Sequence, residues 1–318
     1  MFYNYQTDGI TQSILQQWMS CREKSRLNLE GWTAIRHSPA LTYGTIVHAV
    51  LEKVYNDIRL KKLSQIPSEK YIKKITKEVE LQWKKENPTK DEKILDMLDN
   101  CLLDAEATLP EYFKFWWRQD FKKIQWRNLE QEFKIPYITK KGDKTFIKGK
   151  KDGVYGVKYL KLFETKTKSM INVDDLIDTL WFEFQVKLYL WAIKRTYKQI
   201  PSGVNYNIIR KPMITRRTNE SKVLYSKRLR KDIQSRPEFY FIRLDISVSK
   251  IDMLKFENEL EVIIQEFINW RKGKLSTYKN TSACLDKYGR CPYLNICSRG
   301  DWSGFKKRKT VFQELVDK

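Results

Sequence analysis

The sequence lacks the features that place a chain in or across a membrane. No apolar run in its 318 residues approaches the roughly 20 residues that span a bilayer, and no secretory signal peptide is visible. It also lacks a Gly-Lys-Ser/Thr phosphate-binding loop, so any nucleotide-driven motor would be another chain. Internal repeats and low-complexity segments are missing as well. We therefore expect a soluble, cytoplasmic protein without a membrane partner.

Acidic residues are scarce relative to basic ones. The chain carries 61 Lys and Arg against 39 Asp and Glu, which gives a formal net charge of +22. Such an excess predicts a polyanionic partner, with nucleic acid ahead of a membrane surface. The 41% hydrophobic and 13% aromatic content is typical of a folded globule, and the length allows one large domain or two.

Cysteine is infrequent, and its five positions are unevenly distributed. Cys284, Cys291 and Cys297 lie within fourteen positions of one another, and Cys21 lies near the start. In a reducing compartment such clustered cysteines are more often metal ligands than disulfides. Cys101 precedes two leucines on a predicted helix, so we expect it to be a small, buried hydrophobic residue.

The most informative stretch is 147–168, which the residue pattern predicts to be two β-strands joined by a turn at 155–158. Because strand side chains alternate between faces, Glu164 and Lys166 point the same way, and the turn brings Asp152 back beside Glu164. The two carboxylates suit Mg²⁺ or Mn²⁺, and the ammonium could position a water or stabilise charge on a phosphate. Together they suit metal-assisted phosphodiester hydrolysis. A hairpin with a surface ion pair explains the same residues equally well.

The remaining pattern predicts helices and strands around this hairpin. We expect helices over 11–30, from about residue 42 or 44, over 68–119 with a break at Asn87-Pro88, over 173–197 and over 248–272. We expect further strands over 129–137, 204–209 and 239–246, and a hairpin turn at 140–143. These form one integrated domain with four parts, at 1–41, 42–128, 129–247 and 248–318.

Several other polar residues admit two interpretations. The only histidines are His37, in an expected loop, and His48, at the edge of an apolar helical stripe, where a structural role is the commoner one. Gln185 and Tyr189 lie on one helix face and could contact a substrate phosphate or the site lysine. Alternatively, Tyr189 packs in the core and Gln185 is solvated. A basic segment at 211–236 is either a solvated surface or a phosphate-tracking one. Its candidate nucleic-acid contacts are Arg216, Arg217, Lys227, Arg228 and Arg230.

Taken in order, these residues resemble the RecB-type branch of the PD-(D/E)XK nuclease superfamily. The matching pieces are Gly44-x3-His48, Gly149-x2-Asp152, Glu164-Thr-Lys166-Thr167 and Gln185-x3-Tyr189. The arrangement of Cys21 and the C-terminal cysteine trio is similar to that in the iron–sulfur subgroup of this branch, which includes AddB nuclease domains. Many phage RecB-like exonucleases are similar to this sequence as well. The family often has Asp at the position of Glu164, and the trio lacks a Cys-x2-Cys pair.

The resemblance implies an α/β (α+β) fold, namely a restriction-endonuclease-like mixed β-sheet flanked by helices, with a helical insertion. It implies that His48, Asp152, Glu164 and the Thr165 carbonyl hold Mg²⁺ or Mn²⁺ and that Lys166 orients the attacking water. It also implies a structural [4Fe–4S] cluster that joins the two ends of the chain, with zinc as the alternative. Its ligands would be Cys21, Cys284, Cys291 and Cys297.

The function that the resemblance implies is metal-dependent hydrolysis of DNA. We expect an exonuclease acting on DNA ends or single strands, in recombination, repair or phage DNA metabolism (in the host cytoplasm if phage-encoded). A helicase or recombination protein is an expected partner. Two alternatives remain open at this point: a non-catalytic DNA-binding subunit of a recombination complex, and an RNA-processing nuclease.

Overall fold

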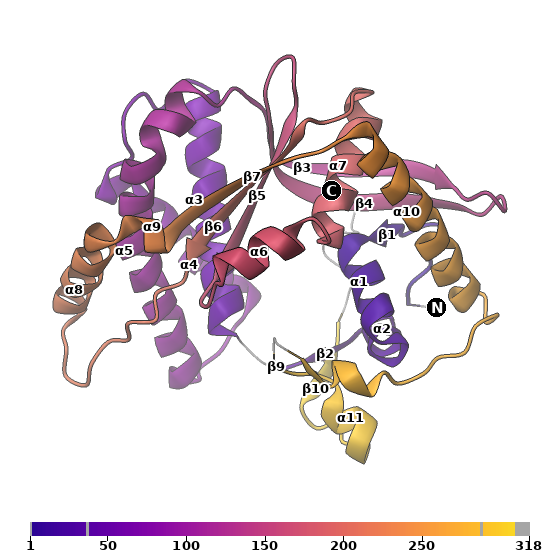
Figure 1. Ribbon diagram of the computed structural model, residues 1–318. Helices are drawn as coiled ribbons and strands as arrows, with labels where there is room; N and C mark the ends of the chain where they lie inside the picture. Colours follow the sequence, from indigo (N-terminus) through magenta and orange to yellow (C-terminus); the bar gives the residue numbers. More distant parts are fainter. Residues whose placement is uncertain (1, 36–37, 287–288, 309–318) are drawn as a thin grey trace.

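The computed structural model describes residues 2–35, 38–286 and 289–308, so His37 lies outside the described residues. It shows a mixed α/β fold in which helices cover both faces of a central, mixed β-sheet (Figure 1). The fold class expected from the sequence is therefore confirmed. Within the described residues, none of the helices combines the length and apolar character required to cross a bilayer.

The sheet has six strands in the order β1-β4-β5-β6-β7, and β3 pairs with β4 beside this path. The β5–β6 and β1–β4 pairs are parallel, and the other pairs are antiparallel. Every residue of β6 is buried, as expected for a strand covered by helices on both sides. The strands are β1 (Ile10–Thr11), β3 (Trp126–Ile138), β4 (Lys144–Tyr155), β5 (Lys161–Lys168), β6 (Gly203–Arg210) and β7 (Phe241–Ser247).

Each face of the sheet has its own hydrophobic core. One core contains α1 (Gln12–Ser20), α7 (Phe184–Tyr197) and α10 (Lys250–Arg271), which lie on the right in Figure 1. The other face carries α3 (Pro39–Arg59), α4 (Glu69–Glu86), α5 (Glu92–Lys122), α8 (Lys222–Ser235) and α9 (Pro237–Tyr240). The central sheet thus receives side chains from both directions, which holds its strands in a fixed register.

The C-terminal segment returns to the N-terminal one. β10 (Phe305–Lys307) pairs antiparallel with β2 (Trp32–Ala34), and the hydroxyl of Tyr293 donates to the carbonyl of Trp32 at 2.8 Å. Leu27, Tyr293 and Ile296 form a small core between the two segments. The other elements here are α2 (Arg22–Leu29), η1 (Thr281–Ala283), β8 (Leu285–Asp286), β9 (Gly289–Arg290) and α11 (Leu294–Arg299). Residues about 270 positions apart in the sequence therefore form one subassembly.

Three details differ from the sequence-based expectation. The helix expected over 11–30 is divided at Cys21, whose backbone is extended (φ −160°, ψ 117°). The helix expected over 173–197 is two helices, α6 (Val173–Leu180) and α7, because Glu183 leaves helical geometry (φ −64°, ψ 107°). The β4–β5 turn is longer than expected and occupies 156–160. Gly156 has φ 103° there, where a Cβ atom would lie 2.1 Å from the carbonyl oxygen of Tyr159.

Candidate metal centre

Asp152 lies where β4 separates from β5. The two strands pair only from Gly153 opposite Phe163 to Tyr155 opposite Lys161. One residue beyond this pairing, Oδ2 of Asp152 accepts a 2.7 Å hydrogen bond from the backbone N–H of Thr165. The short hairpin therefore brings the Asp152 carboxylate beside the residue that separates Glu164 from Lys166.

Glu164 and Lys166 point the same way from β5, as the strand alternation predicts. Nζ of Lys166 donates to Oε1 of Glu164 at 2.6 Å and to Oε1 of Gln185 at 2.7 Å. The side chain of Glu164 is 1% exposed and that of Lys166 is 26% exposed, so the amine lies between the interior and solvent. Gln185 reaches this amine from the first turn of α7. The structure thus joins two of the sequence motifs in one hydrogen-bonded group.

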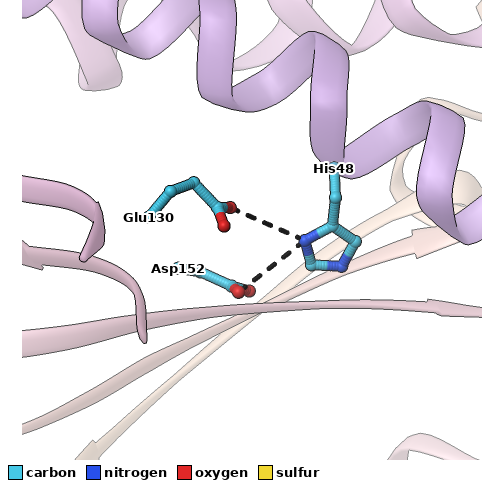
Figure 2. A group of neighbouring side chains, drawn as sticks. All are labelled: His48, Glu130 and Asp152. Atoms are coloured by element: carbon cyan, nitrogen blue, oxygen red, sulfur yellow. Dashed lines mark ion pairs between the residues drawn. The ribbon is translucent and has the colours of Figure 1, made fainter. Parts of the chain in front are cut away.

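A second group contains a residue that the sequence pattern did not reveal. Ligand atoms of His48, Glu130 and Asp152 all lie within 4.8 Å of one another (Figure 2). Nδ1 of His48 is 3.7 Å from Oδ1 of Asp152 and 3.9 Å from Oε1 of Glu130. The carboxylate of Glu130 also accepts from Lys150 at 2.7 Å. Imidazole from α3 and carboxylates from β3 and β4 therefore meet at one point.

Glu130 is placed by strand register and by an unusual backbone conformation. Leu129 pairs with Gly153 and Gln131 with Lys151, so Glu130 lies opposite Asp152. Its φ is 47°, in the left-handed region that residues other than glycine rarely adopt. Such strain costs free energy and is concentrated at functional sites. The registry of the predicted 129–137 and 147–154 strands was the one signal in the sequence that could have indicated Glu130.

The motif glycines have a steric reason. A Cβ atom at Gly44 would lie 3.1 Å from Oγ1 of Thr167, so glycine lets α3 approach β5 closely. His48 is one turn further along the same helix and therefore faces the sheet near Asp152. A Cβ atom at Gly149 would lie 2.8 Å from the ring of Phe133, which packs against this part of β4. Both glycines hold the backbone where the polar side chains can converge.

Burial and mutual charge determine the protonation of these groups. Burial and the Asp152 charge raise the pKa of Glu164 to about 7, and burial also raises the pKa of Asp152. At His48, burial favours the neutral ring, but the charges of Asp152 and Glu130 outweigh it and raise the pKa. Burial likewise disfavours the Lys166 ammonium, but Glu164 and Asp152 raise its pKa overall. The lysine is therefore cationic at neutral pH, and Glu164 is partly protonated there, so a bound cation could displace its proton.

The donor set fits a divalent metal ion. Oε2 of Glu164 is buried and, within the described part of the chain, has no hydrogen-bond partner. An unpaired buried carboxylate oxygen is costly, and a cation would satisfy it. Carboxylate oxygens with one imidazole suit Mg²⁺ or Mn²⁺. Asp152 links both groups, because it faces His48 and Glu130 on one side and bonds to Thr165 on the other.

The other candidates lie in different surroundings. Tyr189 is 7% exposed and packs edge-to-face on Phe133, with ring centroids 5.9 Å apart, so its ring is part of the core. The basic segment lines a separate cavity of about 630 Å³ that shares no lining residue with the metal centre. Arg216, Arg228 and Arg230 form ion pairs there or nearby with Asp96, Glu220 and Glu69, respectively. Arg217 and Lys227 are exposed.

Four cysteines from the two ends of the chain line one cavity of about 200 Å³. They are Cys21, Cys284, Cys291 and Cys297. All four are free thiols, and burial raises the pKa of two of them, Cys291 and Cys297. Within the described residues, no three of the sulfur atoms lie within 4.8 Å of one another. A tetrahedral zinc site would bring them to about 3.8 Å, given Zn–S bonds of about 2.3 Å. Cys101 is buried on α5, away from this cavity.

Residues 10–298 match the family model described as the PD-(D/E)XK nuclease superfamily. The matched range begins at β1 and ends within α11, so it contains the metal centre, Lys166, Gln185 and the four cysteines of the small cavity. No curated protein shows a significant match to the sequence.

Proposed function

The chain belongs to the PD-(D/E)XK nuclease superfamily, and from this membership we propose that it is a Mg²⁺- or Mn²⁺-dependent deoxyribonuclease. Membership implies a metal-dependent nuclease that binds nucleic acid. The observation that carries the assignment to this chain is the convergence of His48, Glu130 and Asp152 beside the buried Glu164–Lys166 pair. Three acids, an imidazole and an ammonium at one place are the parts that phosphodiester hydrolysis requires.

Each side chain has a proposed role. Asp152, Glu164 and His48, with the Thr165 carbonyl, would hold the metal ion, and Glu130 would add a carboxylate from the neighbouring strand. Bound there, the ion would supply a lower pKa for its water and polarisation of the phosphate. Lys166 remains an ammonium because its pKa is raised, so it acts as a hydrogen-bond donor and not as a base. It orients the attacking water and stabilises negative charge on the phosphate, and Gln185 fixes its position.

The cysteine cavity is proposed to hold a [4Fe–4S] cluster with a structural role. Four thiolates that line one cavity suit such a cluster, and zinc is the alternative. The backbone N–H of Asn280 donates to Sγ of Cys21 at 3.4 Å, and Lys24 and Lys279 line the cavity. Donors and cations of this kind stabilise a negatively charged cluster. Free thiols also support a cytoplasmic location.

Finer aspects of the function follow from the motif order. We propose that the chain belongs to the RecB-like, AddB-like iron–sulfur branch and that it is an exonuclease acting on DNA ends or single strands. Recombination, repair or phage DNA metabolism are its proposed settings. A helicase or recombination protein is its proposed partner.

The test is cleavage of labelled single-stranded DNA, duplex DNA and RNA with Mn²⁺, each with and without EDTA. We expect EDTA-sensitive cleavage of DNA, with shorter products accumulating from one end. Binding of DNA without cleavage would instead identify a non-catalytic subunit. Cleavage confined to RNA would identify a processing enzyme.

A further inference from the structure

The site lysine opens onto a large surface cavity. This cavity has a volume of about 860 Å³ and is lined by the end of β5, by one side of α1 and by the turn between α6 and α7. Lys166 and Gln185 both contribute to its lining. A substrate that occupies this cavity, which we call the α1–α7 groove, can therefore reach Lys166.

The lining of the α1–α7 groove suits a polyanion. It includes Lys24, Lys166 and Lys168, and among the described residues that line it Glu183 alone is acidic. The α1 side supplies amides and hydroxyls, of which Ser13 and Gln16 are exposed. Lysine ammonium groups bind phosphates, and amide and hydroxyl side chains donate to phosphate oxygens or base edges.

One aromatic ring projects into solvent at the same groove. Phe182 is 74% exposed, although it lies in an ordered turn in which its N–H donates to the carbonyl of Thr179 at 2.9 Å. It lies three positions before Gln185, which contacts the site lysine. An exposed aromatic ring beside a cationic groove is the arrangement that proteins use to stack bases of single strands.

We propose that the α1–α7 groove binds a single DNA strand and that Phe182 stacks on one of its bases, so that this residue determines the preference for unpaired substrates. The proposal rests on the proposed nuclease function. A cavity of this size falls within the range that encloses small ligands, about 300–1,000 Å³, so it holds a few nucleotides of one strand. Bases within a duplex are stacked on one another and present no free face to Phe182.

The experiment measures binding separately from cleavage. Fluorescence anisotropy with labelled oligo(dT) in EDTA gives Kd without hydrolysis, for the wild type, Phe182→Ala and Phe182→Trp. Tyr159→Ala is the matched control, because Tyr159 is 63% exposed and does not line the groove. We expect Phe182→Ala to raise Kd at least about fivefold, the Trp variant to remain within about twofold of the wild type, and Tyr159→Ala to change nothing. Thermal melts of all variants check that each is folded.

A strand with abasic positions provides the second arm. The wild type should bind it more weakly than oligo(dT), whereas Phe182→Ala should bind both strands alike, because the stacking contact is already lost. The same Phe182→Ala change should raise KM for single-stranded DNA and leave kcat and duplex binding nearly unchanged. The proposal is overturned if Phe182→Ala binds oligo(dT) with wild-type affinity, or if abasic positions weaken binding equally in both proteins. EDTA-sensitive cleavage in the same samples would still support the nuclease function. If no DNA is cleaved but Phe182→Ala still weakens binding of the single strand, the nuclease function is refuted and the binding proposal is not.

Discussion

The backbone N–H of Thr165 donates a 2.7 Å hydrogen bond to Oδ2 of Asp152. This contact joins the two strand motifs at the residue between Glu164 and Lys166, so the position of the Asp152 carboxylate depends on the backbone of β5. Because a backbone donor holds the carboxylate, side-chain changes on β5 can alter the chemistry of the site without moving Asp152. The variants below use this separation.

Lys166→Ala should give a folded but inactive protein. Loss of one preorganised donor at a reacting phosphate lowers kcat by about 10²–10³. Stability should change little, because Glu164, with a pKa already raised to about 7, can take up a proton when its ammonium partner is removed. Cleavage assays and thermal melts measure both effects.

Lys161→Ala is the matched control for this change, because Lys161 lies on the same strand and pairs with the exposed side chain of Asp245. It should keep wild-type activity. Equal loss of activity in both variants would indicate damage to β5 and not a role of the Lys166 amine.

Metal affinity should increase with pH. In the metal-free protein the pKa of Glu164 is about 7 and that of His48 is raised, so both groups hold protons that a metal ion must displace. Titration calorimetry with Mn²⁺ should show affinity rising as pH increases toward about 7, and levelling once these groups are deprotonated. Affinity that is constant between about pH 5.5 and 7 would contradict this assignment.

The stability of the metal-free protein should respond in the opposite direction. A carboxyl whose folded pKa is raised binds its proton more tightly in the folded state than in the unfolded one. Between the ordinary pKa of 4.5 and about 7, the contribution of Glu164 therefore becomes less favourable as pH rises. The raised pKa of His48 acts in the same sense, since its stabilising contribution is present at low pH and is lost as pH rises through that pKa. Urea unfolding with EDTA at several pH values measures the sum.

Glu130→Gln should weaken Mn²⁺ binding, since it replaces a carboxylate of the three-residue group by a neutral amide. A loss of roughly tenfold or more is expected if Glu130 contacts the ion directly or holds His48 in place. The matched change is Glu132→Gln, two positions along the same strand, where the side chain is exposed. It should leave Mn²⁺ affinity unchanged, and calorimetry distinguishes the two variants.

The strand motif could be predicted from the sequence because its chemistry is local. Glu164 and Lys166 share a face by strand alternation alone, and Asp152 needs only one short hairpin to come near them. Glu130 was missed, because its place follows only from the pairing register of β3 with β4, and no residue pattern indicates its left-handed backbone angle. The division of 173–197 at Glu183 was missed for a related reason. The segment has neither Gly nor Pro at that point, so helical periodicity continues through it.

Cys291→Ala should destabilise the protein and abolish any visible absorbance at about 400 nm in anaerobically purified samples. Cys291 shares its cavity with Cys21, which precedes it by 270 positions, so a cluster there would close a very long loop. Cys101→Ala is the control, because Cys101 is buried in the α3–α5 core and does not line the cavity. A colourless wild type, or a Cys291→Ala protein with normal stability, would contradict the structural cluster.

Thr165→Val should lower stability but leave the metal centre in place. Oγ1 of Thr165 accepts a 3.2 Å hydrogen bond from Nδ2 of Asn207, which is fully buried on β6. Oδ1 of the same amide accepts from Nε of Arg243 at 3.0 Å, so its orientation is fixed and Nδ2 cannot turn to another acceptor. Valine has nearly the shape of threonine, so the main effect is one unsatisfied buried donor, which costs about 1–3 kcal/mol.

The contact to Asp152 comes from the backbone of residue 165 and is the same in the valine variant. Mn²⁺ affinity and kcat should therefore remain close to wild type, while the urea midpoint falls. Thr165→Ser retains the hydroxyl and should recover most of the lost stability. If Thr165→Val instead lost Mn²⁺ affinity at unchanged stability, the side chain of residue 165 would act on the metal site directly. The division between a backbone that positions Asp152 and a hydroxyl that anchors β5 to β6 would then be wrong.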